Sequence, residues 1–419
     1  MWTRRILLLT CLASAGWAQG RAVDLASFDL VWSTIRDTHW QKPPAGLDWD
    51  AIRAEYRPRV QNAATPAEAR VAMQEMIGRL KQTHFAIVPG VTYSSISEDL
   101  GGPGTTGIDL RVLNGEAVVT SVDSSSPAER AGVRPGWVIR AVNGREWAPL
   151  IEASRGAPEL ERTRSLLNRL SGPEGGNIDV SFDSGRGDSG GGAVATLRLG
   201  LTAGRGTYAE FGNLPATRVW YEEKRLGATA YVRFNVFLDI PRLIPAFEKT
   251  LAACQRCDGL IVDLRGNPGG IGGMAMGMAG FLVERPNQRL GTMFMRDATL
   301  NFVINPRPSV FTGPVAILID GTSASTAEIL AGGLRDIGRA RIFGTRSAAA
   351  ALPSVFTRLP NGDGFQYAVA NYVSQGGQAL EGTGVTPDEE VRLTREGLLA
   401  GHDAIIDAAL AWIGKQRKP

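Results

Sequence analysis

The stretch DGTSASTAEIL, residues 320–330, offers the first groups that could do chemistry. It follows the apolar run PVAILI, and the pattern after it predicts a helix, so its hydroxyl residues stand at a strand-to-helix turn. A serine there could be a nucleophile, because the helix dipole favours developing negative charge. Ser325 and Glu328 also have capping-box spacing, and Thr322 or Ser323 could cap the helix instead. These residues alone leave both roles open.

A second candidate is the loop in GLIVDLRGNPGG, residues 259–270. It ends a predicted strand in flexible residues, as a loop that presents N–H groups to an oxyanion requires. A simple tight turn is the alternative. A dinucleotide fingerprint through Gly270, Gly272 and Ala275 is disfavoured, because no acidic residue stands about 20 positions further on at the end of a second strand.

The sequence contains three histidines, the side chains whose usual pKa best suits a base at neutral pH. His84 lies where a predicted helix gives way to a strand. His39 lies near the end of a helix, and His402 lies in the final amphipathic segment. We interpret the last two as structural or solvated.

Three regions with different patterns must position these groups. Residues 24–82 have helical spacing, with Pro66 near the start of one helix. From Gly101 the pattern changes to short strands, including a hairpin around Asn114-Gly115, a short helix at SSSPAERAG and a longer helix from Pro158 to Leu170. The low-complexity segment DSGRGDSGGG is predicted to be a flexible hairpin tip without chemistry.

From about residue 215 strands alternate with helices, which predicts an α/β region with much parallel sheet. Helices are expected at 241–254 and 325–336, a hairpin at Asn361-Gly362, and a final helix in GHDAIIDAALAWI. A length of 419 residues, 43% of them hydrophobic and 21% charged, suits a multidomain folded protein.

The N-terminal sequence MWTRRILLLTCLASAGWAQG predicts a signal peptide cleaved after Ala18 and hence a periplasmic or secreted protein. A lipoprotein acylated at Cys11 is disfavoured by Thr10 before it. Removing residues 1–18 removes two arginines, so the net charge falls from +3 to +1, which indicates neither nucleic acid nor an acidic membrane as partner. No later run reaches the ~18 apolar residues of a membrane helix.

Two cysteines, Cys254 and Cys257, remain after that cleavage, in CQRC. An oxidising compartment would permit a disulfide between them. A redox-active motif is disfavoured, because such motifs usually open a helix whereas this one closes a helical pattern.

The order of helical segment, hairpin-rich domain and α/β region with GLIVDLRGNPGG and DGTSASTAEILAGGLRD resembles the C-terminal processing, or tail-specific, serine peptidases. The resemblance covers nearly the whole chain after residue 18. It implies a multidomain α/β fold with an N-terminal helical domain, a PDZ-like β domain and an α/β, crotonase/ClpP-like peptidase core. The corresponding limits are 22–98, 99–205 and 212–415.

The resemblance also implies a nucleophile, Ser325, and an oxyanion hole formed by the backbone N–H of Gly269 or Gly270 with that of Thr326. One departure concerns the base. Most tail-specific peptidases have a lysine and, four residues later, a glutamine, where this chain has Ala350 and Ser354. After Ser325 the only lysines are Lys415 and Lys418, so the usual Ser-Lys pair is excluded.

The tricorn core branch of this family instead has a Ser-His pair at the end of the N-terminal helix and a glutamate before a G-V-x-P-D segment. This chain has Thr83 and His84 at the first place and Glu381, in LEGTGVTPD, at the second. The resemblance implies that His84 is general base and acid, and that Glu381 orients the site through Thr83. A histidine and a carboxylate are the partners that a serine nucleophile needs.

The PDZ-like segment implies protein or peptide substrates held by their C-terminal tails, with Gly107 and Ile108 of GTTGID as contacts. A domain that only gates the site is the alternative. No metal or organic cofactor is implied. The expected function is an exported serine endopeptidase. The rival is a catalytically inactive periplasmic binding protein on a degenerate peptidase core, and the two differ in whether His84 and Glu381 reach Ser325.

Overall fold

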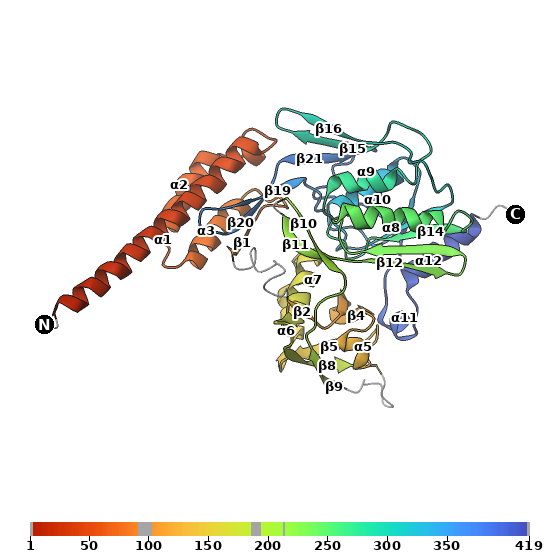
Figure 1. Cartoon of the computed structure of the whole chain (residues 1–419), viewed down its shortest axis with the longest axis horizontal. Helices are drawn as coiled ribbons and strands as arrows, with labels where there is room; N and C mark the ends of the chain where they lie inside the picture. The colour runs from red at the N-terminus through yellow and green to blue at the C-terminus, as the bar shows by residue number, and fades with distance from the viewer. Residues whose placement is uncertain (1–2, 91–102, 186–193, 213, 417–419) are drawn as a thin grey trace.

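The computed structural model describes residues 3–90, 103–185, 194–212 and 214–416, and Figure 1 shows their arrangement. Helix α1 projects to one side, a small β-rich domain lies below the centre, and a large sheet with helices on both faces lies on the other side. The second and third of these parts are called the middle domain, residues 103–202, and the core domain, residues 205–416.

The N-terminal helices form a bundle that is completed by a distant hairpin. Phe28, Ile35 and Met73 are fully buried in one cluster with Phe365 and Ala368. Thr65 caps α3 by accepting a hydrogen bond from Glu68 N, with Pro66 in the first turn. The elements are α1 (Thr3–Thr38), a 3-10 turn (Pro44–Gly46), α2 (Trp49–Gln61), α3 (Pro66–Gly78), β1 (Ala86–Val88) and the hairpin β19 (Ser354–Arg358) and β20 (Gly364–Ala368).

The middle domain is an antiparallel sheet in the order β3-β4-β5-β8-β9, with α7 packed on β3. Among the described strands β3 pairs only with β4, so its other edge is unpaired. Its elements are β2 (Gly104–Thr105), β3 (Ile108–Leu113), β4 (Glu116–Val122), α5 (Pro127–Arg130), β5 (Val138–Val142), β6 (Arg145–Glu146), α6 (Ala148–Ala153), α7 (Glu159–Asn168), β7 (Ser171–Gly172), β8 (Asn177–Asp183) and β9 (Val194–Gly200).

The core domain is built on the sheet β12-β13-β14-β17-β18-β22, which is parallel from β13 onward. Its first elements are β10 (Thr207–Phe211), β11 (Leu214–Val219), β12 (Tyr221–Leu226), β13 (Thr229–Phe234), α8 (Ile240–Ala252), β14 (Gly259–Asp263), α9 (Gly272–Ala279), β15 (Gln288–Met295) and β16 (Thr299–Ile304). The others are β17 (Val315–Ile319), α10 (Thr326–Asp336), β18 (Arg341–Gly344), β21 (Ala370–Ser374), β22 (Glu389–Glu390), α11 (Arg395–Leu399) and α12 (Ala404–Lys415).

The two central strands of this sheet, β14 and β17, are buried on both faces. Their sequences are therefore nearly continuous runs of apolar residues, without the alternation of apolar and polar residues of a half-exposed strand. Val262 and Ile317 pack with α8, α9 and α10 on one face, whereas Ile261 and Leu318 pack with α12 on the other. Because parallel strands end at one edge, the loops after β14 and β17 lie together there.

Most of the predicted elements are confirmed, including the hairpin turn at Asn114-Gly115 and the helix from Thr326 to Asp336. Helix α2 lies within residues 24–82, for which helical spacing is predicted. His402 precedes the N-cap of α12 rather than lying within it. The predicted hairpin tip falls largely on residues 186–193, outside the described residues, as do residues 1–2 of the predicted signal peptide.

Candidate active site

The turn between β17 and α10 holds Ser325 in an unusual backbone conformation, with φ 54° and ψ −118°. N-cap residues normally have extended backbone. A positive φ in a non-glycine residue costs on the order of 1–3 kcal/mol and persists only where the surroundings enforce it. Two acceptors do so, because Ser325 N–H donates to Ala350 O at 2.7 Å and to Glu328 Oε2 at 2.9 Å.

The predicted capping box is present at the start of α10. Ser325 is the N-cap of α10 and Glu328 is three residues later, so the arrangement is present. The Glu328 carboxylate makes its hydrogen bond to Ser325 N, but the Ser325 hydroxyl makes no cap hydrogen bond of normal geometry. The hydroxyl instead lines a cavity of about 1040 Å³, called the central cavity below. It is therefore available for another role.

Glu328 is a fully buried carboxyl that fixes the segment beside Ser325. Its Oε1 accepts from Ser347 Oγ at 2.5 Å and from Ala349 N at 3.0 Å, and its Oε2 also accepts from Ala350 N at 3.1 Å. Burial raises the pKa of Glu328 to about 7, against the opposing effect of these hydrogen bonds. Ala350, at the place of the expected lysine, presents only a methyl group to the central cavity.

The loop after β14 lies directly against Ser325. A Cβ on Gly269, whose φ is +96°, would stand 2.7 Å from Ser325 Cβ and 2.8 Å from Thr326 N, so only glycine fits. Gly269 N–H donates to Asn267 Oδ1 at 2.9 Å. Within the described residues, neither Gly270 N–H nor Thr326 N–H donates to another group. These two N–H groups border the central cavity beside the serine.

His84 is connected to Glu381 through Thr83. Thr83 N donates to Glu381 Oε1 at 2.8 Å, and Thr83 Oγ1 donates to Glu381 Oε2 at 2.8 Å. Thr83 Oγ1 also lies 2.8 Å from His84 Nδ1. Because the single hydroxyl proton of Thr83 is given to Glu381, Thr83 Oγ1 accepts from His84 Nδ1–H. The lone pair of the neutral ring is therefore at Nε2.

His84 and Ser325 both line the central cavity, although no hydrogen bond joins these two side chains in the described structure. Catalytic hydrogen bonds are often long without substrate. Burial, followed by the positive charge of Arg164, lowers the pKa of His84 from 6.5 to about 4. His84 is thus neutral at physiological pH, the state in which it can accept a proton.

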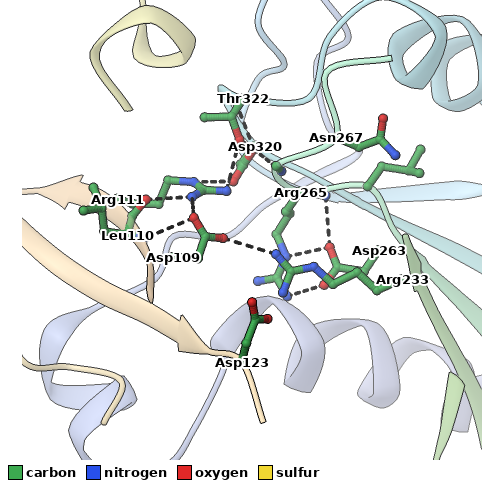
Figure 2. A network of polar contacts seen from close by, with 12 residues as sticks. Asp109, Leu110, Arg111, Asp123, Arg233, Asp263, Arg265, Asn267, Asp320 and Thr322 are labelled. Atoms are coloured by element: carbon green, nitrogen blue, oxygen red, sulfur yellow. Dashed lines mark hydrogen bonds and ion pairs between the residues drawn. The ribbon is translucent and has the colours of Figure 1, made fainter. Parts of the chain in front are cut away.

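A buried ion network anchors the turn before Ser325 to the middle domain (Figure 2). Arg111 of β3 donates to Asp320 Oδ2 at 2.8 Å and to Asp109 Oδ1 at 2.8 Å. Asp320 Oδ1 in turn accepts from Thr322 N at 2.9 Å. In the same view, Arg265 and Asp263 pair at 2.6 Å at the end of β14. No local pattern around either residue indicates the contact between Arg111 and Asp320, because the two residues are 209 positions apart.

The remaining candidates lie elsewhere. His39 is fully buried, with Nε2 2.9 Å from Gln82 Oε1, and is structural as predicted, whereas His402 is exposed beside Asp407. Gly107 and Ile108 lie at the start of β3, outside the central cavity. Cys254 and Cys257 form a disulfide. Among the described residues, no cluster of histidine, cysteine or carboxylate side chains could hold a metal ion.

Comparisons with known proteins agree with this fold and these loops. A carboxyl-terminal-processing protease of Picosynechococcus is 26% identical over 381 residues, covering 86% of this chain and 81% of that protein. The Arabidopsis thaliana protein named carboxyl-terminal-processing peptidase 3, chloroplastic, is 23% identical, covering 88% of this chain and 70% of that protein. The solved structure of the photosystem II D1 C-terminal processing protease has a TM-score of 0.58 at 21% identity, covering 91% of this chain and 98% of that one.

The fold and these matches define a serine-type peptidase. The model of peptidase family S41 matches residues 228–391, which contain both the loop after β14 and the turn at Ser325, and the tricorn protease C1 domain model matches residues 25–78. Over residues 228–391 the chain is thus similar to peptidase family S41. Of the helices that the structure describes, none is long and apolar enough to cross a membrane.

Proposed function

We propose that this chain is an exported serine endopeptidase that cleaves protein or peptide substrates near their C-termini through an acyl-enzyme on Ser325. One observation carries the proposal. The hydroxyl of Ser325 borders the same cavity as a histidine whose free lone pair is at Nε2. Glu381 fixes that tautomer through Thr83. This arrangement replaces the lysine that is absent at Ala350.

The proposed chemistry follows from these positions. His84 Nε2 accepts the proton of Ser325 Oγ as the oxygen attacks the substrate carbonyl. The N–H groups of Gly270 and Thr326 stabilise the oxyanion. His84 then gives the proton to the leaving amine, and an ester on Ser325 remains. A water molecule, deprotonated by His84, hydrolyses the ester. Glu381 stabilises the positive imidazole ring through Thr83.

Substrate docking is assigned to the middle domain as a PDZ-like module. The unpaired edge of β3 can accept an extended peptide as an additional strand, and α7 lies beside it. Gly107, with φ +81°, and Ile108 are the proposed contacts of the peptide carboxylate at the start of β3, where Gly107 N–H donates to Thr105 Oγ1 at 3.1 Å in the described structure. A Cβ on Gly107 would stand 2.2 Å from Ser126 Cβ, so this loop requires glycine.

Export and the domain limits belong to the same proposal. The signal peptide at residues 1–18 directs export, and the Cys254–Cys257 disulfide suits an oxidising compartment. The proposed domains span residues 22–98, 99–205 and 212–415.

Labelling with a fluorophosphonate tests the proposal, since the probe needs an activated serine but no particular peptide sequence. We expect wild-type protein to be labelled on Ser325 with loss of fluoride, and Ser325→Ala to show no labelling above background. Gel fluorescence and mass spectrometry of the modified peptide give the readout. An unlabelled wild type across pH 6 to 9, with labelling only in Ala350→Lys, would instead identify a peptidase fold without a working base.

The pH dependence of labelling should reveal the lowered pKa of His84. Only the neutral ring can accept a proton, so the rate falls as pH drops through that pKa. We expect a midpoint near pH 4 rather than near 6.5, because burial and Arg164 disfavour the charged ring. Removing the positive charge in Arg164→Gln should move the midpoint to higher pH.

Arg169→Gln is the matched control for this shift, because Arg169 is exposed at the end of the same helix and does not line the central cavity. It should leave the midpoint unchanged. Circular dichroism must show folded protein at each pH. An acid midpoint near 6.5 in wild type, or the same midpoint in Arg164→Gln, would contradict the assignment.

A further inference from the structure

Helix α7 of the middle domain contributes one wall of the central cavity. Leu160, Glu161 and Arg164 line it, on the same cavity as Ser325 and His84. Among the described residues that line the cavity, Arg164 is the one cation and Glu161 the one anion. Much of the remaining wall is apolar, with contributions from Phe211, Leu214, Leu238, Met293 and Phe302. A single guanidinium in a largely apolar wall can distinguish ligands that carry a negative charge from neutral ones.

Arg164 has no fixed partner within the described residues, which show neither a hydrogen bond nor an ion pair to its side chain. Burial lowers the pKa of Arg164, whereas Glu161, three positions earlier, raises it. By accessible surface the Arg164 residue is nevertheless exposed to solvent. Arginine presents a planar set of N–H donors that matches a carboxylate, and such charged pairs are among the strong hydrogen bonds.

The charge of Arg164 also reaches the catalytic base. The charge that acts on His84 is that of Arg164 from α7, Glu161 of the same helix acts on Arg164, and Glu381 contacts His84 through Thr83. Arg164 disfavours the positive ring that must form when Ser325 loses its proton. A carboxylate bound to Arg164 would neutralise this charge, so the same contact that binds substrate would also favour proton transfer.

We propose that Arg164 determines specificity by binding a carboxylate of the substrate segment that occupies the central cavity. The carboxylate is either the terminal one or an aspartate or glutamate side chain near the cleaved bond. This inference rests on the proposed function, because it assumes that a peptide enters the cavity. The carboxylate that Arg164 binds lies inside the central cavity, and this binding place is distinct from the proposed one at Gly107 in the middle domain.

Binding to the Ser325→Ala variant tests the inference without turnover. The probes are a fluorescein-labelled octapeptide of alanine and leucine with a free terminal carboxylate, its C-terminal amide, and amides that carry one aspartate or one asparagine at each position in turn. Fluorescence anisotropy gives the Kd. We expect at least one carboxylate-bearing peptide to bind about tenfold more tightly than its neutral match, as for one charge-assisted contact. Comparison of the free-acid peptide with the aspartate-containing amides shows whether the bound carboxylate is the terminal one or a side chain.

Three further substitutions, each combined with Ser325→Ala, show whether Arg164 is responsible for the preference for a carboxylate. Arg164→Gln should abolish the preference, Arg164→Lys should restore part of it, and Arg169→Gln should retain it. A preference that persists in Arg164→Gln would place carboxylate recognition elsewhere and overturn the inference, as would equal binding of charged and neutral peptides or no binding at all. Labelling of Ser325 by the neutral fluorophosphonate in wild type separates such a failure from failure of the proposed function.

Discussion

Replacing His84 with alanine is expected to lower kcat by a factor on the order of 10⁶, the loss found when the base of a serine peptidase is removed. The variant should fall below detection with fluorescein-labelled casein and should lose fluorophosphonate labelling. The reason is that His84 has its free lone pair at Nε2 and shares the central cavity with Ser325, while the cavity-lining residues that the structure describes include no lysine. Ala350 stands where the family usually has one.

A smaller loss of kcat is expected when a residue behind His84, in the hydrogen bonds that run through Thr83 to Glu381, is replaced. Thr83→Val removes the hydroxyl that joins His84 Nδ1 to Glu381, and should cost about 10⁴ in kcat, as loss of an orienting carboxylate does. His402→Ala is the matched control, because His402 is exposed and distant from the cavity, and it should have wild-type activity. If His84→Ala kept more than a hundredth of wild-type activity, another group would be the base.

Replacing Arg111 with methionine is expected to lower the free energy of unfolding by about 3–5 kcal/mol, because it leaves the carboxylate of Asp320 buried without its cation. Burial alone would raise the pKa of Asp320, but Arg111 lowers it, so the pair is charged in the folded protein. Urea denaturation followed by tryptophan fluorescence measures the change. Labelling of Ser325 should also weaken, because Asp320 holds the turn that carries the serine.

The double variant Arg111→Met/Asp320→Asn is the informative comparison. It removes both charges and should recover part of the lost stability. Arg155→Met is the control for loss of a surface ion pair, since Arg155 and Glu152 are both exposed, and it should change the free energy of unfolding by less than about 0.5 kcal/mol. A loss below about 1 kcal/mol in Arg111→Met would mean that solvent reaches Asp320.

The features that could be predicted from the sequence are the helices, strands and turns that a short stretch of residues determines by itself. Buried strands β14 and β17, the helix after Ser325 and the turn at Asn114-Gly115 each have their own signal in composition or spacing. The partnership of Thr83 with Glu381, 298 residues apart, had no such signal and came only from family resemblance.

Other features were missed because they depend on how separate parts of the chain pack. The contact of Arg111 with Asp320 joins two domains, and nothing around either residue indicates it. Arg164 looks like an ordinary surface arginine on an amphipathic helix until α7 is placed against the cavity. The same is true of the hairpin around Phe365, which reads as a local turn yet completes the N-terminal core.

That last feature affects the order in which the protein can mature during synthesis. The ribosome makes Phe28 and Met73 hundreds of residues before Phe365 and Ala368, which share their cluster. A nascent chain that ends before the hairpin leaves this apolar surface uncovered and also lacks Glu381. Because domains tend to fold in order from the N-terminus, a truncated or unfinished chain holds His84 on an incomplete support. The N-terminal core is therefore completed only late in synthesis, once the ribosome has made the hairpin that closes it.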